Sequence, residues 1–313
     1  MKKKRLSITQ QIMAVAIEKL NTKQNDITRK AYIRNTKKYI YFCRENFNCK
    51  SYEECKNHIQ NYADYLNLNG YTPSSIHTYI AAACASFDVK MDTVNKPKRI
   101  VSEFVRNRNI SKKMRTSQDL NNPKWSYIVE FQKRVGIRRN ELLHLKGSDF
   151  IETSNGCFVH VKRGKGGKEQ YQAIMPGDID FVKKYFCCVG KDDYVFDKKY
   201  FANALPFHKL RAECARDCYF KLLKQVQENP DFAKQLEKEI RQRWQENKDK
   251  RGRVKPFPEK EIRGYYTVRG GNRKRAIEKG LPISYNRLIA LWVSIFKLSH
   301  YRLNVAIENY FLN

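Results

Sequence analysis

The sequence lacks any long apolar segment. Its 313 residues contain no run that approaches the roughly 20 apolar residues needed to span a bilayer. The basic start, residues 1–20, resembles the beginning of a signal peptide, but glutamines interrupt its apolar part and Glu18 ends it. We therefore expect a helix in this stretch, with part of one face formed by Ile8, Ile12, Val15 and Ile17.

Cysteine patterns typical of disulfide frameworks or zinc sites are also missing. The nine cysteines are an odd number without a secretion signal, which favours reduced thiols in a cytoplasmic protein. Cys214 and Cys218 are one helical turn apart and could bind a metal together with His208, but a fourth ligand is absent. We therefore predict no metal site.

Acidic residues are scarce relative to basic ones. The chain has 62 Lys and Arg against 32 Asp and Glu, which gives a formal net charge of +30. Such a surplus repels itself in a compact protein unless a polyanion is the usual partner, so nucleic acid is the first expectation and an anionic membrane surface the competing one. The hydrophobic content of 41% supports folded cores, and the length allows two domains.

The first 90 residues are helix-like throughout. Ser51 and Glu54 have the spacing of a capping box, and apolar residues then recur at helical spacing until Gly70. A further helix is predicted to begin at Thr72 as the cap, with Pro73 in its first turn. The sequence therefore predicts a small helical domain at residues 1–90.

Residues 91–117 have the composition of a linker, because they lack apolar periodicity and carry many basic residues, including Lys112 and Lys113. Such a segment could lie along a phosphate backbone or be a plain solvated tether. Beyond it, residues 118–313 form the second predicted domain. Its stretch CFVHVKRGKGGKEQYQAIM indicates two β-strands joined by a glycine-rich turn, and everything after them reads as helical. The predicted fold is thus mainly α with a small antiparallel sheet, an α+β protein.

Four short stretches place basic or titratable side chains where the local structure turns. They contain, in order, Arg138 and Arg139; Lys162, Arg163, Lys165 and Lys168; His208 and Arg211; and His300 and Tyr310. Each stretch also has an ordinary interpretation as a solvated surface, a soluble hairpin tip, a partly buried histidine or a packed terminal helix. Tyrosine has a pKa of about 10, so as a nucleophile it requires cations that stabilise the phenolate and the transition state.

Taken in order, the motifs G-I-R-x-N-E-L-L, G-K-G-G-K-E, H-K-L-R and L-S-H with a tyrosine near the end resemble the tyrosine recombinases, or phage-type integrases. The helical first domain is similar to the core-binding domain of that family, and the second to its catalytic domain. The resemblance is strong over residues 130–175, 205–220 and 290–313 and loose elsewhere.

The resemblance implies a role for individual residues. Arg138 and Arg211 match the two catalytic arginines, and Glu141 matches the acidic residue that supports the first one. Lys165 matches the hairpin lysine that protonates the leaving 5′ oxygen. His208, His300 and Tyr310 match the two active-site histidines and the nucleophile. The interval from His300 to Tyr310 is one residue longer than is usual in the family.

The segment between Arg211 and His300 is also longer than in most members, with a basic insertion at about 225–285. Residues 241–275 alone carry 13 Lys and Arg against four acids. The aromatic residues Trp244, Tyr265 and Tyr266 lie among them, which suggests DNA contact, with a solvated insertion as the alternative. The residues predicted to bind DNA are Lys162, Arg163, Lys168, Arg139, Lys112, Lys113, Arg269, Arg273, Lys274 and Arg275.

By resemblance, the expected activity is site-specific cutting and rejoining of duplex DNA through a 3′-phosphotyrosyl link, for integration or excision of a mobile element. The family works as a homotetramer on double-stranded DNA, with no metal, no ATP and no other cofactor. A type IB topoisomerase or telomere-resolving enzyme is the nearest alternative. A DNA-binding regulator without catalysis is a second alternative, of a different class.

Overall fold

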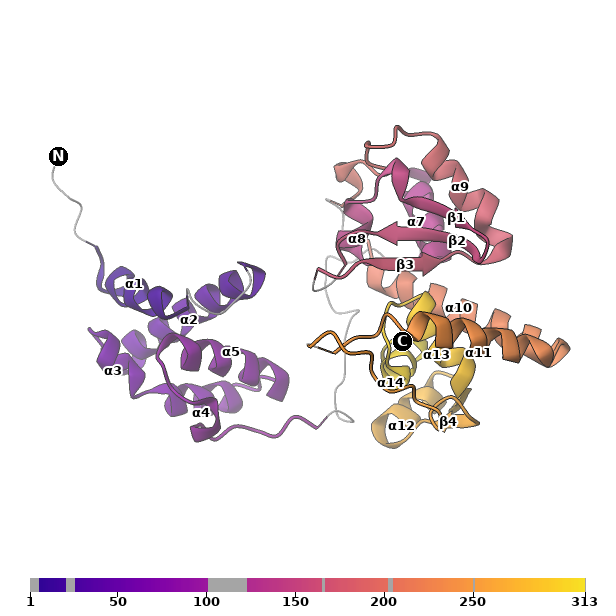
Figure 1. The fold of residues 1–313 in the computed structure, drawn as a ribbon. Coiled ribbons are helices and arrows are strands. Elements are labelled where there is room, and N and C mark those ends of the chain that lie inside the picture. Colours follow the sequence, from indigo (N-terminus) through magenta and orange to yellow (C-terminus); the bar gives the residue numbers. More distant parts are fainter. Residues whose placement is uncertain are drawn as a thin grey trace. The chain divides into compact units, whose positions relative to one another are not determined.

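The computed structural model describes residues 6–20, 26–100, 123–164, 167–201, 205–249 and 251–312. The chain divides into two compact units, Met1–Phe104 and Val105–Asn313. Helices dominate, together with a three-stranded and a two-stranded antiparallel sheet, so the predicted α+β class is confirmed (Figure 1). The predicted DNA-binding residues Lys112 and Lys113 and the predicted catalytic Lys165 lie outside the described residues.

In its described residues, the first unit is a bundle of five α-helices. They are α1 (Ile8–Leu20), α2 (Asp26–Phe47), α3 (Tyr52–Lys56), α4 (Ile59–Leu68) and α5 (Pro73–Ser86). The long helix α2 packs against α1 and α5, and its Tyr39, Ile40 and Cys43 are fully buried in the core. The buried face of α1 consists of Thr9, Ile12, Ala16 and Leu20, whereas Val15, which was expected on that face, is exposed.

Local capping fixes two of these helices as predicted. The Ser51 hydroxyl accepts a hydrogen bond from the backbone N–H of Glu54 at 3.3 Å at the start of α3. Thr72 accepts one from the N–H of Ser75 at the same distance, and Pro73 occupies the first turn of α5. The apolar run that follows Ser51 is divided into α3 and α4 rather than forming one helix.

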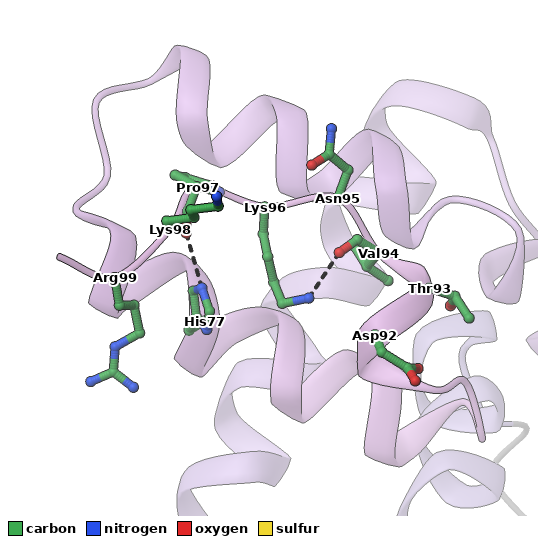
Figure 2. Close-up of a pocket in the computed structure, with 9 residues that line it drawn as sticks. All are labelled: His77, Asp92, Thr93, Val94, Asn95, Lys96, Pro97, Lys98 and Arg99. Atoms are coloured by element: carbon green, nitrogen blue, oxygen red, sulfur yellow. Dashed lines mark hydrogen bonds between the residues drawn. The ribbon is translucent and has the colours of Figure 1, made fainter.

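The packing of the first unit continues past residue 90. Residues Met91–Thr93 form a 3-10 turn, and Val94 is buried in the same core, four residues into the predicted linker. Figure 2 shows the segment that follows as it crosses α5: the His77 ring nitrogen Nε2 lies 3.0 Å from the carbonyl oxygen of Pro97, and Lys96 donates to the Val94 carbonyl at 2.8 Å. The contact with His77, together with the bond from the Asn95 N–H to the Gln60 side chain at 2.8 Å, holds the predicted linker against the helices as far as Pro97.

The second unit begins with α7 (Pro123–Val135) and the short α8 (Arg139–Leu143), followed by β1 (Phe150–Thr153), β2 (Gly156–Val161), β3 (Gln170–Ala173) and α9 (Ile179–Cys187). The strands form one antiparallel sheet in the order β1-β2-β3. The predicted pair β2 and β3 is present, with Val159 opposite Gln172, and β1 is an additional strand. An apolar cluster from α7, β2 and α9 forms the core of this half.

The other half of this unit is helical. It contains α10 (Phe207–Glu228), α11 (Asp231–Trp244), α12 (Gly270–Glu278), α13 (Arg287–Phe296), α14 (Leu303–Ala306) and the π-helix η6 (Ile307–Phe311). The helix α10 packs against α7 on one side and against α13 and η6 on the other, so it joins the two halves. The expectation that everything after β3 is helical is wrong, because β4 (Tyr265–Thr267) pairs with β5 (Ser284–Asn286). Only three residues form each strand, which is too short for a recognisable alternation.

Much of the predicted insertion is part of the core. Leu236, Ile240 and Trp244 form the buried face of α11, and this helix packs on α13. The indole N–H of Trp244 donates to the Lys255 carbonyl at 2.9 Å, and only 5% of the residue is exposed. Its predicted contact with DNA is therefore wrong, because the ring is enclosed by the protein. Among the described residues, no helix has both the length and the apolar character required to cross a membrane.

Candidate active site

The first arginine is placed by a tight turn between α7 and α8. Gly136 has a φ of +70°, and a Cβ atom at this position would lie 2.9 Å from the Sγ atom of Cys214, so both backbone conformation and space favour glycine. Arg138 then caps α8, and its backbone N–H donates to the Glu141 carboxylate at 2.8 Å. The Arg138 guanidinium also donates to Glu141, at 2.5 Å. The Arg138 side chain is thus fixed at its base and at its charged end.

The second arginine lies near the start of α10, just past its first turn. Arg211 is only 1% exposed, and its Nη2 donates to the carbonyl oxygen of Leu298 at 2.8 Å. Its Nη1 lies 3.7 Å from the second carboxylate oxygen of Glu141. The same Leu298 carbonyl accepts a longer bond, 3.4 Å, from Arg138. One carboxylate and one backbone carbonyl therefore hold two guanidinium groups side by side.

This arrangement is electrostatically costly. Burial lowers the pKa of Arg211 from its ordinary value; Tyr310 and Glu141 oppose the shift, and the neighbouring Arg138 cation adds to it. The buried Nε and Nη1 atoms of Arg211 make no hydrogen bond to any residue that the structure describes. Guanidinium is charged at any ordinary pH and rarely leaves buried N–H groups unsatisfied. The site therefore has donors available for an anion.

Tyr310 lies against Arg211 and the two predicted active-site histidines. Its ring centroid is 5.8 Å from the Arg211 guanidinium carbon and 5.4 Å from the ring centroid of His208, which meets it edge-on. The hydroxyl oxygen is 3.3 Å from Nε2 of His300. Tyr310 is buried, with 6% of its surface exposed. Five of the six residues predicted to be catalytic therefore converge, and the sixth, Lys165, lies outside the described residues.

The tyrosine is carried by a π-helix. The helix α14 ends at Ala306, and the next residues widen so that the N–H of Leu312 bonds the carbonyl of Ile307, five residues earlier, at 3.2 Å. A π-helical turn holds about one more residue than an α-helical turn and is frequently found at functional sites. The interval from His300 to Tyr310, which is one residue longer than is usual in the family, thus ends in a π-helical turn that contains Tyr310.

The remaining residues of the hairpin and of α8 lie around this group. The Lys162 ammonium pairs with Asp149 at 2.8 Å, and Arg163 and Lys168 are exposed at the base of the β2–β3 turn. Arg139 is directed away from Arg138, because its guanidinium donates to the Phe201 carbonyl. Of the two adjacent arginines, only Arg138 faces Glu141 and Leu298.

The predicted DNA-binding residues of the insertion gather on α12. Arg269 caps this helix and is exposed, as are Arg273 and Lys274. Arg275 is half-buried and donates to the side chain of Asn272. Tyr265, on β4, is 61% exposed, whereas the hydroxyl of Tyr266 donates to Glu308 at 2.7 Å. The exposed cations and Tyr265 form a basic surface next to a short β-ribbon.

Sequence reasoning missed three polar residues behind the site. Gln170 accepts a bond from Arg138 at 3.3 Å, and Gln172 and Lys297 are buried beside the Leu298 carbonyl. The alternation Q-Y-Q in β3 was the available signal, because residues two apart share one face of a strand. Lys297 gave no local signal, since a lysine that ends a helix is usually exposed.

The cysteines do not form a metal site in the part of the chain that the structure describes. Cys214 and Cys218 are buried in α10, and the Cys218 thiol lies 3.5 Å from the sulfur of Met175. No group of three potential metal-ligating side chains is gathered among the described residues. Burial raises the pKa of Cys218 to about 12, so this thiol stays protonated.

Comparison with known proteins gives a structural likeness only. No protein-family model matches the sequence, and no curated protein matches it. The crystal structure of XerA recombinase is similar at 19% sequence identity and a TM-score of 0.23, over 67% of this chain and 84% of that chain. The XerH site-specific recombinase bound to difH substrate, in a pre-cleavage complex, is similar at 14% identity and a TM-score of 0.34, over 70% of this chain and 87% of that chain.

Both structures are of recombinases, the class of protein that the sequence motifs indicate.

Proposed function

We propose that the protein is a site-specific tyrosine recombinase, which cuts and rejoins double-stranded DNA through a covalent link to Tyr310. The observation that carries the proposal is the convergence of Tyr310 with two guanidinium groups, one of which has buried donors that bond no described residue. A phosphodiester supplies the anion that such donors require, and planar guanidinium groups suit its oxygens. The charge of +30 suits a polyanionic substrate.

The proposed reaction is a transesterification. The Tyr310 oxygen attacks the phosphorus atom, a new P–O bond forms, and the bond from phosphorus to the 5′ oxygen breaks. His300, whose Nε2 is 3.3 Å from the tyrosine oxygen, accepts the phenolic proton, and Lys165 donates a proton to the leaving 5′ oxygen. Arg138 and Arg211 stabilise the charge that develops on the non-bridging oxygens.

The covalent link keeps the energy of the phosphodiester bond. Rejoining is therefore the same reaction in reverse with a 5′ hydroxyl as nucleophile, and neither ATP nor a metal ion is needed for the atoms and charges to balance. We further propose that protomers act together as a homotetramer on two DNA sites, and that the exchange integrates or excises a mobile element.

Exposed cations extend the proposed DNA interface beyond the reacting phosphate. Arg163 and Lys168 lie at the hairpin base, and Arg269, Arg273 and Lys274 lie on α12. Contacts of this kind fix the position of a protein on the phosphate backbone without reading the sequence. They would hold the duplex while the buried arginines act on one phosphate.

The test is covalent trapping on a nicked suicide substrate. After cleavage the short fragment that carries the free 5′ hydroxyl diffuses away, so the strand cannot be rejoined and the adduct accumulates. Because the recognition sequence is not fixed by the structure, the substrate is first selected from a random duplex library by binding. We expect a protein–DNA adduct that survives denaturation, with the DNA attached to Tyr310 in peptide mapping. Tyr310→Phe should bind the same DNA and give no adduct.

Three outcomes separate the candidate functions. An adduct followed by exchange between two duplexes supports a recombinase, whereas an adduct with relaxation of supercoils and no exchange supports a topoisomerase-like enzyme. Specific binding without any adduct from the wild-type protein would contradict an enzymatic role and favour a DNA-binding regulator.

A further inference from the structure

We infer that Gln172 is a positioning residue of this site. It fixes the turn at residues 297–299, and this turn in turn fixes the positions of the two arginine side chains. This inference rests on the proposed function for its meaning, but the contacts that support it are independent of any substrate. Gln172 lies in β3, and none of its surface is exposed. It touches neither Arg138 nor Arg211 by any hydrogen bond that we observe among the described residues, so its effect on them is indirect.

The Gln172 amide joins two segments that are far apart in the sequence. Its Nε2 donates to the carbonyl of Lys297, and also to the carbonyls of Val135 at 3.2 Å and Gly136 at 3.5 Å. Its Oε1 accepts from the hydroxyl of Ser299 at 3.3 Å. One side chain thus binds the turn that leads into Arg138 and the turn that follows α13.

The turn at residues 297–299 is held from a second direction. Lys297 is 1% exposed, and its ammonium donates to the carbonyls of Arg134 and Ala173, at 2.8 Å each. Ser299 has a φ of +50°, a left-handed conformation that is uncommon outside glycine and persists where the surroundings impose it. The bonds to Gln172 and Lys297 supply that constraint.

The held turn presents its middle residue to the arginines. Leu298 offers its carbonyl to Arg211 at 2.8 Å and to Arg138 at 3.4 Å, while the next residues carry His300 toward Tyr310. A displacement of the turn would therefore move the acceptor that both guanidinium groups share. Misplacement of catalytic groups by about 1 Å can reduce a rate by roughly 100-fold.

The experiment uses the full-length protein with Gln172→Met, which keeps the length of the side chain and removes its donor and acceptor. We expect a fall of about 100-fold in the single-turnover rate of adduct formation, with DNA affinity within about three-fold of wild type. Ser299→Ala, which removes one contact of the same network, should give a smaller fall. The double variant should be no slower than Gln172→Met alone, because the two changes break one network.

The matched control is Val182→Ala, which makes a cavity in α9 at a fully buried position outside this network. It should lower the melting temperature without a comparable change in the cleavage rate. Equal losses of rate in both variants at equal stability would overturn the inference, because the rate would then follow stability alone. Additive effects of Gln172→Met and Ser299→Ala would also overturn it.

A second measurement does not depend on activity. Phenylglyoxal modifies accessible arginine, and mass spectrometry locates the modified residue. Arg211 should react slowly in wild type, since it is 1% exposed, and several-fold faster in Gln172→Met, while Val182→Ala stays at the wild-type rate. If wild type forms no adduct but this difference is seen, the proposed function fails and the positioning role stands; unchanged labelling would contradict the positioning role itself.

Discussion

Arg211→Met is the substitution that best separates catalysis from folding at this site. Methionine fills a similar space but has no charge and no N–H donors. In the structure it would remove the 2.8 Å bond to Leu298, the 3.7 Å ion pair of Nη1 with Glu141 and the Nε and Nη1 donors, which make no hydrogen bond to a described residue. Glu141 would still be paired with Arg138 at 2.5 Å, so no buried carboxylate is left alone.

The expected effect on cleavage is large. Loss of one preorganised donor to a developing negative charge typically lowers a rate by about 10²–10³, which corresponds to roughly 2.7–4 kcal/mol. The guanidinium of Arg211 offers two such donors, so we expect at least about a 100-fold fall in the single-turnover rate. DNA affinity should change little, because one phosphate contact lowers the salt dependence of binding by a slope of only about 0.9.

The expected effect on stability is small. Losing a hydrogen bond from a charged group costs about 1.5–3 kcal/mol. The loss of the charge has the opposite effect on the free energy of unfolding. The folded variant no longer buries a cation beside Arg138, and burial of one ion costs several kcal/mol. The two contributions oppose each other, so we expect a net change within about 2 kcal/mol, or at most roughly 8 °C in melting temperature.

The assay combines adduct formation on the suicide substrate, binding at several salt concentrations and thermal unfolding monitored by circular dichroism. Arg139→Met is the matched control, since it removes the adjacent guanidinium that is directed at Phe201 instead of at the site. Its cleavage rate should stay within about ten-fold of wild type. A melting temperature lowered by far more than 8 °C in Arg211→Met, or equal losses of rate in both variants, would refute the reasoning.

Two further predictions concern the leaving group and the DNA interface. Lys165→Ala should slow cleavage of normal DNA. A substrate with sulfur in place of the 5′ bridging oxygen should restore the rate, because a thiolate leaves without a proton. If the sulfur substrate does not restore the rate, Lys165 is not the general acid. Replacing Arg269, Arg273 and Lys274 together by alanine should lower the salt slope of DNA binding by about 2–3. The control with Lys224, Lys234 and Lys238 replaced has the same net charge, and an identical slope for the two variants would mean that α12 does not contact DNA.

Local patterns predicted much of the helical fold. The caps at Ser51 and Thr72 are read from a few adjacent residues, because a capping hydrogen bond is itself formed within one turn of chain. The strands β2 and β3 were likewise visible through the glycine-rich turn between them. The strands β4 and β5 were not, since each is three residues long and their pairing joins segments about 20 residues apart.

Exposure of individual residues could not be predicted in the same way. Trp244 lies among basic residues in the sequence, yet it is buried because α11 packs on α13. Arg138 and Arg139 are neighbours in the sequence but point to different partners. Whether a side chain on a helix is exposed depends on which distant segment covers it, and a local pattern does not contain that information.

The sequence by itself determined the charge of the protein, the class of its fold and the residue types that could act on a phosphodiester. Only the tertiary structure decided how these residues meet. Arg138 and Arg211 share a carbonyl from Leu298, and Gln172 and Lys297 hold the turn that presents it. The physical reason is that a buried cation is stable only where its acceptors are fixed, and here those acceptors come from segments that the chain brings together by folding.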